Sequence, residues 1–296
     1  MHRTGSTYLQ KRIFPRLDVD CLEKPDVRYL LHSPEFDPYI MRTQLEAGVP
    51  MKRKVRLLVS QETLGGRPEV NPTHWPTMGI ERLKATFPQG NIILVLRNQW
   101  DYLESMYAYR VMSRGLEFRS FTGYLEDKLK RSLIATLSYD RLVCEYRAAF
   151  GDDSVLILLY EQLARDPEAF LKRLCGFIGV ELPAIENSSR PNMTSRAPWI
   201  LNTHRIFNLP GWLAKVAVAH VPGGGQTRAN DMARAYGRVK ERTFASIGTT
   251  GRVAPRARLA VRPSVKARID REIGPRNRRL AVTLGEPLSE FGYCVD

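Results

Sequence analysis

Short apolar runs alternate with amphipathic stretches along the first 180 or so residues of the chain. A run of four to eight apolar residues bounded by turn residues predicts a strand, and apolar positions spaced three or four apart predict a helix. Asn91–Leu96 is nearly all apolar, which is the pattern of a strand buried on both faces. The predicted strands are Val27–Leu31, Val55–Ser60, Asn91–Leu96 and Ser154–Leu159.

Helices are predicted between these strands, with proline or aspartate at several starts and glycine at several ends. They cover Tyr8–Ile13, Pro38–Ala47, Ile80–Thr86, Asp101–Arg114 with Asp101 as N-cap, Phe121–Phe150 as two helices, Pro167–Ile178 and Ser264–Leu284. Strands that alternate with helices predict parallel βαβ units. The fold class is therefore α/β, a three-layer sandwich around a central parallel sheet, with a basic and mainly helical C-terminal region.

The character of the chain changes after about Leu182. Residues 183–230 are rich in Pro, Asn, Ser and Gly, and residues 228–279 are dominated by arginine and lysine. We predict a single domain over 1–296, with an α/β core at 1–182, an irregular basic insertion or flap at 183–263, and a C-terminal helix and tail at 264–296. The basic stretch is either a mobile flap or the solvated face of ordinary helices.

The formal net charge of +14 predicts an anionic partner such as a nucleotide, an acidic polymer or a membrane surface. The four cysteines are scattered without metal-ligand spacing, so no metal site is expected, and they fit a reducing cytoplasm. No apolar run reaches the ~18 residues of a membrane-spanning helix. Peripheral contact with a membrane stays open.

The first eight residues contain a cation, a glycine and three hydroxyls ahead of a predicted helix. Unpaired N–H groups at a helix start, together with hydroxyl donors, suit a phosphate or sulfate. A capped helix start with an incidental glycine is the alternative interpretation.

A second candidate anion site follows the strand Asn91–Leu96. Arg97 stands directly after the strand, and Ser105 lies further along the next predicted helix. Ligands of open α/β sheets bind beyond the carboxyl ends of the strands, so both side chains can grip one phosphate. The alternative is a surface arginine and an ordinary helix serine.

These segments resemble those of one family. Arg3–Tyr8 is similar to the 5′-phosphosulfate loop of sulfotransferases that use 3′-phosphoadenosine 5′-phosphosulfate (PAPS), and Arg97–Ser105 is similar to their 3′-phosphate motif. Two further segments resemble family sequences: Tyr160–Leu163 with Asp166-Pro167 and Phe177–Gly179, and Asn277–Leu280 through Phe291–Tyr293. The resemblance runs from Arg3 to Tyr293 and is weakest between about 190 and 265.

The resemblance implies PAPS as the donor, a hydroxyl or amine as the acceptor, and no requirement for a metal. Arg3 would also stabilise charge in the reaction, although it stands where the family usually has lysine and cannot donate a proton near neutral pH. Gln99 replaces the usual proline, which loosens the turn, and Tyr8 replaces tryptophan. The implied donor-binding residues are Arg3, Thr4, Gly5, Ser6, Thr7, Tyr8, Arg97 and Ser105.

The acceptor must lose a proton, and the family uses either a histidine or a glutamate as the base. Glu62 follows the strand Val55–Ser60 in a segment that resembles the Ser-x-Glu-x-Leu of carbohydrate-type and bacterial sulfotransferases. His74, in a proline-rich loop, is the rival base or a substrate contact. Arg190 and Arg196 are candidate substrate contacts in a later polar loop.

Three other functions compete with this one. A P-loop kinase would carry lysine directly before the hydroxyl of its glycine loop, whereas here the cation precedes Gly5. A nucleic-acid-binding protein would interleave aromatic residues with the basic ones, which this chain does not. A third alternative is a sulfotransferase fold that only binds a nucleotide. The acceptor is not identified by the sequence: a sugar, a lipid glycan and a small hydroxylated metabolite all remain open, and a carbohydrate is slightly favoured by the glutamate-type base and the basic surface.

The family's anion loop is fed by a central strand, and no such apolar run precedes Arg3 in this sequence. We therefore expect in-frame codons for an apolar strand upstream of Met1. Without that strand we expect a mobile donor loop and weak activity.

Overall fold

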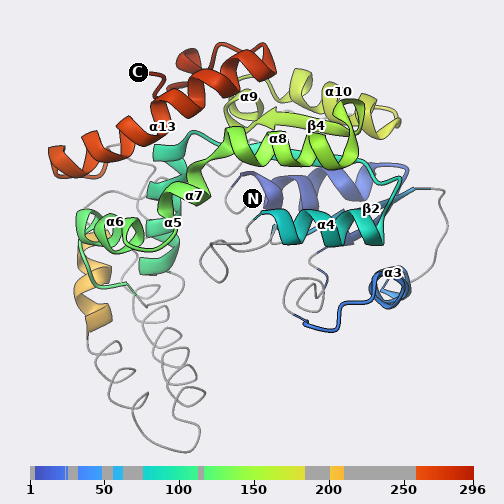
Figure 1. Ribbon diagram of the computed structural model, residues 1–296, viewed down its shortest axis with the longest axis horizontal. Helices are drawn as coiled ribbons and strands as arrows, with labels where there is room; N and C mark the ends of the chain where they lie inside the picture. Colours follow the sequence, from blue (N-terminus) through green and yellow to red (C-terminus); the bar gives the residue numbers. More distant parts are fainter. Residues whose placement is uncertain are drawn as a thin grey trace, which may run out of the picture. The chain divides into compact units, whose positions relative to one another are not determined.

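The computed structural model describes residues 4–23, 25, 33–48, 56–62, 76–112, 117–183, 201–209 and 258–296. The described residues belong to two compact units. The first draws on Met1–Gln99, Arg131–Asn192 and Asp270–Asp296, and the second on Trp100–Lys130 and Met193–Ile269. Figure 1 shows elements of both units, and those that it labels keep their labels below. The domain boundaries expected from the sequence stay a prediction.

The described strands of the first unit form two parallel pairs. β1 (Asp20–Glu23) pairs with β2 (Leu57–Ser60), and β3 (Ile92–Leu96) pairs with β4 (Val155–Leu159). The mixed α/β character with parallel strands is thus confirmed. The single central sheet stays a prediction, because the described strands make two separate pairs.

The strands of the structure differ in part from those predicted. The predicted strand Val27–Leu31 lies outside the described residues. β1 was not predicted, because two of its four residues, Asp20 and Glu23, are acidic and no apolar run marks it. β3 was expected to be buried on both faces, which is wrong for Ile92–Val95: these residues are half-buried, and only Leu96 is fully buried. β4 is the ladder partner of β3 within the described part of the chain, so the other edge of β3 is not covered by a described strand.

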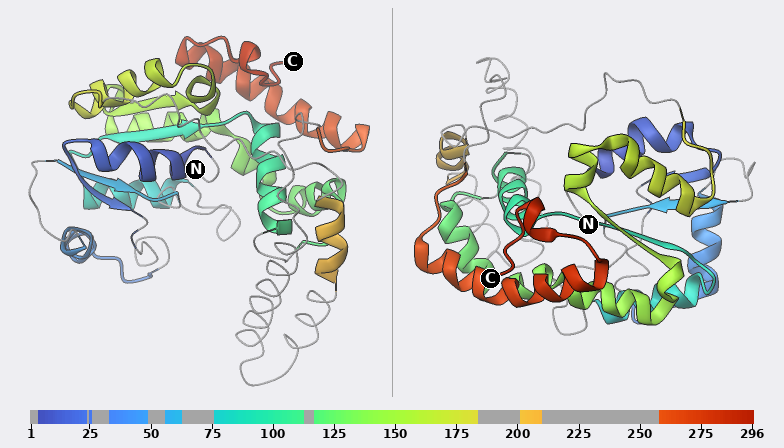
Figure 2. Two further views of the ribbon diagram at one scale, coloured as in Figure 1. Left: turned by 180° about the vertical axis from the view of Figure 1, so that it is seen from behind. Right: turned by 90° about the horizontal axis from the view of Figure 1, so that it is seen from above.

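Both strand pairs send alternate side chains into the same two apolar clusters. Cys21, Leu58 and Val95 pack with one cluster, whereas Leu22 and Val59 pack with the other. Successive side chains of a strand point to opposite faces, so this alternation places the strands between two apolar layers. Figure 2 (right view) shows α8 and α10 on opposite sides of the strands. Described helices of the first unit therefore lie on both faces of its described strands, and a three-layer sandwich around one central sheet stays a prediction.

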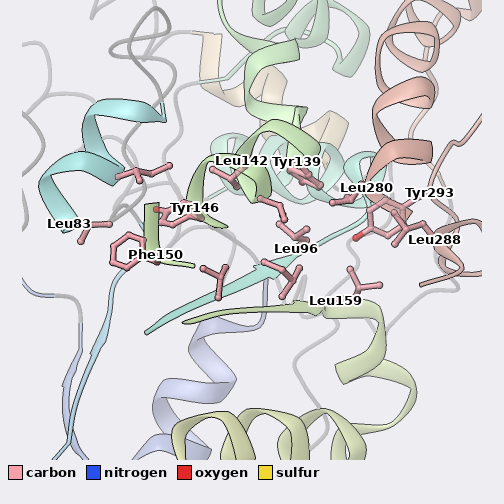
Figure 3. Close-up of a cluster of buried hydrophobic side chains, with 14 of the residues drawn as sticks. Leu83, Leu96, Tyr139, Leu142, Tyr146, Phe150, Leu159, Leu280, Leu288 and Tyr293 are labelled. Atoms are coloured by element: carbon pink, nitrogen blue, oxygen red, sulfur yellow. The ribbon is translucent and has the colours of Figure 1, made fainter. Parts of the chain in front are cut away.

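One layer of the first unit is built on α3 (Pro38–Ala47), α4 (Thr77–Thr86), α8 (Tyr139–Phe150) and the end of α13 (Pro263–Leu284). Figure 3 shows this cluster, with Leu96 and Leu159 at the ends of β3 and β4. The other layer contains the N-terminal helical segments and the pair α9 (Tyr160–Arg165) and α10 (Pro167–Ile178). The N-terminal segments are α1 (Ser6–Tyr8), a π-helix at Leu9–Ile13 and a 3-10 helix at Phe14–Arg16.

Helix ends follow the local sequence where a cap is strong. Asp37 accepts hydrogen bonds from the backbone N–H groups of Tyr39 and Ile40 at the start of α3, as its sequence predicts. α10 ends at Gly179 in the left-handed conformation, also as predicted. The predicted helices at 80–86 and 264–284 are confirmed with small shifts of their starts.

Two helix predictions are wrong. Phe121–Phe150 contains three helices rather than two: α6 (Phe121–Leu129), α7 (Leu133–Leu137) and α8. The extra break falls at Ser138, which leaves the helical region at ψ 71°. Asp101 is not an N-cap, because α5 (Gln99–Met112) begins two residues earlier and Asp101 lies in its first turn.

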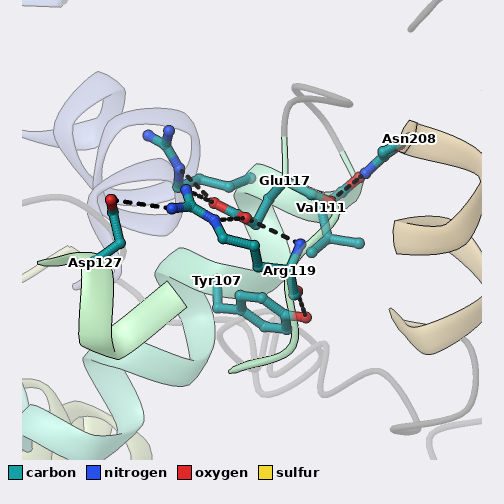
Figure 4. A network of polar contacts seen from close by, with 7 residues as sticks. Tyr107, Val111, Glu117, Arg119, Asp127 and Asn208 are labelled. Carbon is teal, nitrogen blue, oxygen red and sulfur yellow. Dashed lines mark hydrogen bonds and ion pairs between the residues drawn. The ribbon is translucent and has the colours of Figure 1, made fainter. Parts of the chain in front are cut away.

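In the described part of the second unit, the carboxylate of Glu117 is buried and hydrogen-bonded. Arg119 Nε donates to Glu117 Oε1 at 2.8 Å, and Asn208 Nδ2 donates to the backbone carbonyls of Val111 and Glu117 at 2.9 and 2.7 Å. Figure 4 shows these contacts, which join α5 to the loop before α6 and to the helix at 201–209. A buried charge is tolerated when it is paired and hydrogen-bonded, as here.

The basic segment predicted at 228–279 is described only from residue 258 onward. In the second unit Arg258 pairs with Asp101 and Arg262 with Glu126, each at 2.6 Å. In the first unit Arg279 pairs with Asp140 at 2.7 Å. The described part of the segment therefore lies on and beside an ordinary helix, α13. No helix of the described ranges is long and apolar enough to cross a membrane.

Candidate functional site

The N-terminal loop and the segment after β2 meet through one side-chain hydrogen bond. Ser6 Oγ donates to Glu62 Oε1 at 2.7 Å, across 56 positions of the sequence. Both side chains are partly buried. Two residues singled out from separate motifs thus lie in direct contact.

Gly5 determines how the loop turns into α1. Its φ is +83°, and its carbonyl accepts hydrogen bonds from the N–H groups of Tyr8 and Leu9 at 2.9 and 3.1 Å. A Cβ at this position would lie 2.9 Å from Leu163 Cδ2, closer than side chains tolerate. The glycine is therefore required both by its backbone conformation and by the close packing of α9.

The other loop residues differ in exposure. Thr4 is 3% exposed and Tyr8 is 8% exposed, with its ring in the apolar cluster that also contains Leu158 and Leu163. Thr7 is exposed. Ser6 and Thr7 are therefore the loop hydroxyls that solvent or a ligand can reach.

A second contact holds the carboxyl end of β2 against the N-terminal helices. Gln10, which is 1% exposed, donates through Nε2 to Ser60 Oγ at 3.0 Å and to the Ser60 carbonyl at 3.3 Å. Ser60 is the last residue of β2, two positions before Glu62. This contact, which no motif of the sequence predicts, restricts where the Glu62 backbone can lie.

Arg97 lies at the carboxyl end of β3, as its position in the sequence predicts. Its guanidinium stacks on the ring of Tyr160 with Cζ 4.6 Å from the ring centroid. The same ring would lie 3.3 Å from a Cβ on Gly5. One aromatic side chain, at the end of β4, therefore contacts Arg97 and borders the N-terminal loop.

Glu161 connects its own recognised segment to two others, the one after β3 and the one near the end of the chain, through hydrogen bonds. Its carboxylate accepts from the Asn98 backbone N–H at 2.9 Å and from Tyr293 Oη at 3.3 Å. Asn98 Nδ2 also donates to the Phe291 carbonyl at 3.4 Å. Sequence reasoning did not assign Glu161 a role, although the segment Tyr160–Leu163 that carries it was recognised.

The side chain of Gln99 is buried and hydrogen-bonded. Its side-chain amide exchanges hydrogen bonds with that of Asn277, at 2.6 and 3.2 Å, and both residues are 1% exposed. Asn277 also donates to the Cys294 carbonyl at 2.7 Å. The expectation that Gln99 loosens the turn stays a prediction, and the structure adds that the amide gains hydrogen-bond partners that proline cannot supply.

Several predicted residues are not placed in the site. Arg3, His74, Arg190 and Arg196 lie outside the described residues. Ser105 lies on α5 in the second unit, whereas Arg97 belongs to the first, so a shared grip by the two stays a prediction.

The chemistry of the contacting groups suits an anion. Ser6 supplies a hydroxyl donor, and Arg97 supplies a guanidinium that can bind phosphate or sulfate oxygens in a bidentate manner. Glu62 is a carboxylate placed within hydrogen-bond distance of the loop. A hydroxyl donor can bind an anion, and a carboxylate can accept a proton.

Comparison with known proteins agrees with the resemblance of the motifs. The sequence matches the sulfotransferase family over residues 23–184, more than half of the chain. Among solved structures, the chain is similar to a sulfotransferase from Alicyclobacillus acidocaldarius, with 20% identity, a TM-score of 0.48, and coverage of 70% of this chain and 92% of that one. None of the curated proteins matches the chain. From the extent of the family match, the chain belongs to the sulfotransferase family, whose enzymes typically use PAPS as the sulfuryl donor.

Proposed function

We propose that this chain transfers a sulfuryl group from PAPS to a hydroxyl or amine of an acceptor, with a carbohydrate as the first acceptor class to test. The observation that carries the proposal is the 2.7 Å hydrogen bond between Ser6 and Glu62. It brings the loop that resembles the phosphosulfate-binding segment into contact with the residue that resembles the family's base. The bond thus supports a single site for donor and acceptor.

The residues divide between binding the donor and activating the acceptor. Thr4 to Tyr8, with Arg3, are proposed to bind the 5′-phosphosulfate, and Arg97 the 3′-phosphate. Ser105 is proposed to bind the 3′-phosphate together with Arg97, on the basis of the spacing of the sequence motif alone. His74, Arg190 and Arg196 remain proposed acceptor contacts on the same basis.

Glu62 is proposed as the base that takes the acceptor's proton. PAPS supplies an activated sulfuryl group and an anionic leaving group when it is bound. The protein's part is to hold the acceptor oxygen in line, accept its proton at the Glu62 carboxylate, and stabilise the charge that develops on the leaving oxygen. The cation of Arg3 suits that last task.

Binding and transfer should be measured separately on the full chain. Calorimetric titration with 3′,5′-adenosine bisphosphate, the product left by the donor, measures the nucleotide site without turnover. Transfer from sulfur-35-labelled donor to a panel of sugars, phenols and amines measures the reaction. Glu62→Gln should lower kcat by about a hundredfold or more while the bisphosphate still binds, because general-base catalysis supplies about 10²–10⁴-fold.

Glu81→Gln is the matched control, since Glu81 is an exposed carboxylate on α4. It should leave both binding and transfer unchanged. If the wild-type chain binds no bisphosphate, the proposed function is wrong. If it binds bisphosphate but Glu62→Gln turns over at the wild-type rate, Glu62 is not the base. Binding with no transfer to any acceptor would favour a nucleotide-binding protein without catalysis.

A further inference from the structure

The hydroxyl of Ser6 has one proton to donate, and in this structure that proton is directed at Glu62. A hydrogen bond from a hydroxyl to a carboxylate is charge-assisted and stronger than one between neutral groups. The same hydroxyl belongs to the loop that is proposed to bind the phosphosulfate. One proton cannot be donated to both partners at once.

We propose that Ser6 is a positioning residue that exchanges its partner, so that occupation of the donor loop removes the Ser6 hydrogen bond from the Glu62 carboxylate and strengthens that carboxylate as a base. This inference rests on the proposed function and adds a coupling between the two halves of the site. The Ser6 hydrogen bond to Glu62 would be lost only when the donor loop is engaged. The base would thus be weaker in the free protein than in the donor complex.

The surrounding contacts allow this exchange with little movement. Gln10 fixes Ser60 at the end of β2, and Gly5 is held by its packing against Leu163 and by its accepted hydrogen bonds. The backbones that carry Ser6 and Glu62 are therefore both anchored. Rotation of the Ser6 side chain between staggered positions redirects its hydroxyl without moving either backbone.

The exchange has a consequence for the strength of the base. A donated hydrogen bond stabilises a carboxylate in its charged form and so makes it a weaker proton acceptor. When Ser6 turns away, the carboxylate regains basicity at the moment it is needed. The proton of the acceptor then passes to Glu62, the acceptor oxygen bonds to sulfur, and the bond between sulfur and the 5′-phosphate oxygen breaks with its electron pair leaving on the phosphate.

A double-mutant cycle on nucleotide binding tests the inference without relying on turnover. The bisphosphate Kd is measured for the wild type, Ser6→Ala, Glu62→Gln and the double variant. Removing the negative charge of Glu62 should tighten binding in both backgrounds, through weaker repulsion of the anion. The tightening should be larger by at least about threefold when Ser6 is present, since residues in contact couple measurably.

Thr7 provides the matched control, because it is a neighbouring hydroxyl of the same short helix and is exposed. The cycle of Thr7→Ala with Glu62→Gln should be additive within about twofold. Ser6→Thr keeps the hydroxyl and should keep the coupling, which guards against a loop that is merely disturbed by the alanine.

A pH profile separates partner exchange from a purely structural role. The acidic limb of the pH profile of kcat/KM for the donor reports the ionisation of the base in the free enzyme. The acidic limb of the pH profile of kcat reports its ionisation in the bound complex. Ser6→Ala should move the first limb to higher pH and leave the second in place.

An additive Ser6–Glu62 cycle with intact bisphosphate binding would overturn the exchange and leave the proposed function standing. Absence of bisphosphate binding by the wild type would overturn both. A Ser6→Ala variant that shifts both limbs equally would also contradict the exchange, because the bond would then persist in the bound state.

Discussion

At the scale of single residues, the departures from the family pattern are as informative as the matches. Gln99 stands where the family usually has proline, and its side chain is paired with Asn277 in the interior of the first unit. Asn277 comes from α13 and also binds the carbonyl of Cys294. The substitution is therefore accommodated by a partner 178 positions away.

We predict that Gln99→Ala destabilises the protein by about 2 kcal/mol or more, because it leaves buried hydrogen-bonding groups of Asn277 without a partner. The combined variant Gln99→Ala/Asn277→Ala should cost less than the sum of the two single changes. Urea unfolding followed by circular dichroism measures these free energies. Gln44→Ala, an exposed amide on α3, should change the free energy of unfolding little. Additive effects would show that the two amides do not depend on each other.

At the scale of elements, the end of α10 links a helix to a strand pair. Gly179 has φ +75°, and its carbonyl accepts a hydrogen bond from Arg56, the residue before β2. A Cβ on Gly179 would lie 3.1 Å from Arg56 Nη2. Backbone conformation and packing both favour glycine here, whereas Gly176 inside the same helix would place a Cβ with nothing within 4 Å.

Gly179 and Gly176 allow a direct comparison, because one ends α10 and the other lies inside it. Gly179→Ala should destabilise the protein by about 1–2 kcal/mol, because a left-handed conformation is costly for a residue with a side chain. Gly176→Ala should stabilise it by about 0.5–1 kcal/mol, since alanine favours a helix interior. Thermal unfolding of both variants checks the opposite signs. A loss of stability in Gly176→Ala would contradict the placement of that residue within α10.

At the scale of the whole molecule, several buried tyrosine and cysteine side chains make the free energy of unfolding depend on pH in the alkaline range. Burial raises the pKa of Tyr107 in the second unit to about 12. In the first unit burial, with a smaller contribution from Glu23, raises the pKa of Cys21 to about 11. Burial also raises the pKa of Tyr146 and of Cys175. In each case the folded protein holds the proton more tightly than the unfolded chain does.

The direction in which stability changes with pH follows from the difference in proton binding between the folded and unfolded states. Groups with a raised folded pKa contribute stability that is complete below their unfolded pKa and is lost as pH rises through the folded value. Stability should therefore fall between about pH 9 and pH 12, because the unfolded chain releases these protons first. Urea midpoints measured at intervals from pH 8 to pH 11 test this. Tyr146→Phe should flatten the fall, whereas Tyr39→Phe, an exposed ring, should not. A midpoint independent of pH over this range would contradict the burial of these groups.

Local pattern was sufficient for most of the described elements, and it singled out Ser6 and Glu62, which lie in contact. The apolar runs at β2, β3 and β4, the Asp37 cap and the Gly179 end depend on neighbouring residues, and such features can be read from the chain itself. The break at Ser138 was missed, since no proline or glycine marks it. β1 was missed because its short, partly acidic sequence becomes a strand only through pairing with β2.

The sequence by itself determined the α/β class, the family and the residue types that suit a sulfuryl donor, because these depend on periodicity and on motifs of adjacent residues. Only the tertiary structure decided which side chains touch. The Ser6–Glu62 bond, the stacking of Arg97 on Tyr160 and the Gln99–Asn277 clamp join residues 56, 63 and 178 positions apart. Such contacts are set by the packing of parallel strands and their covering helices, which fixes distances that the spacing along a chain does not contain.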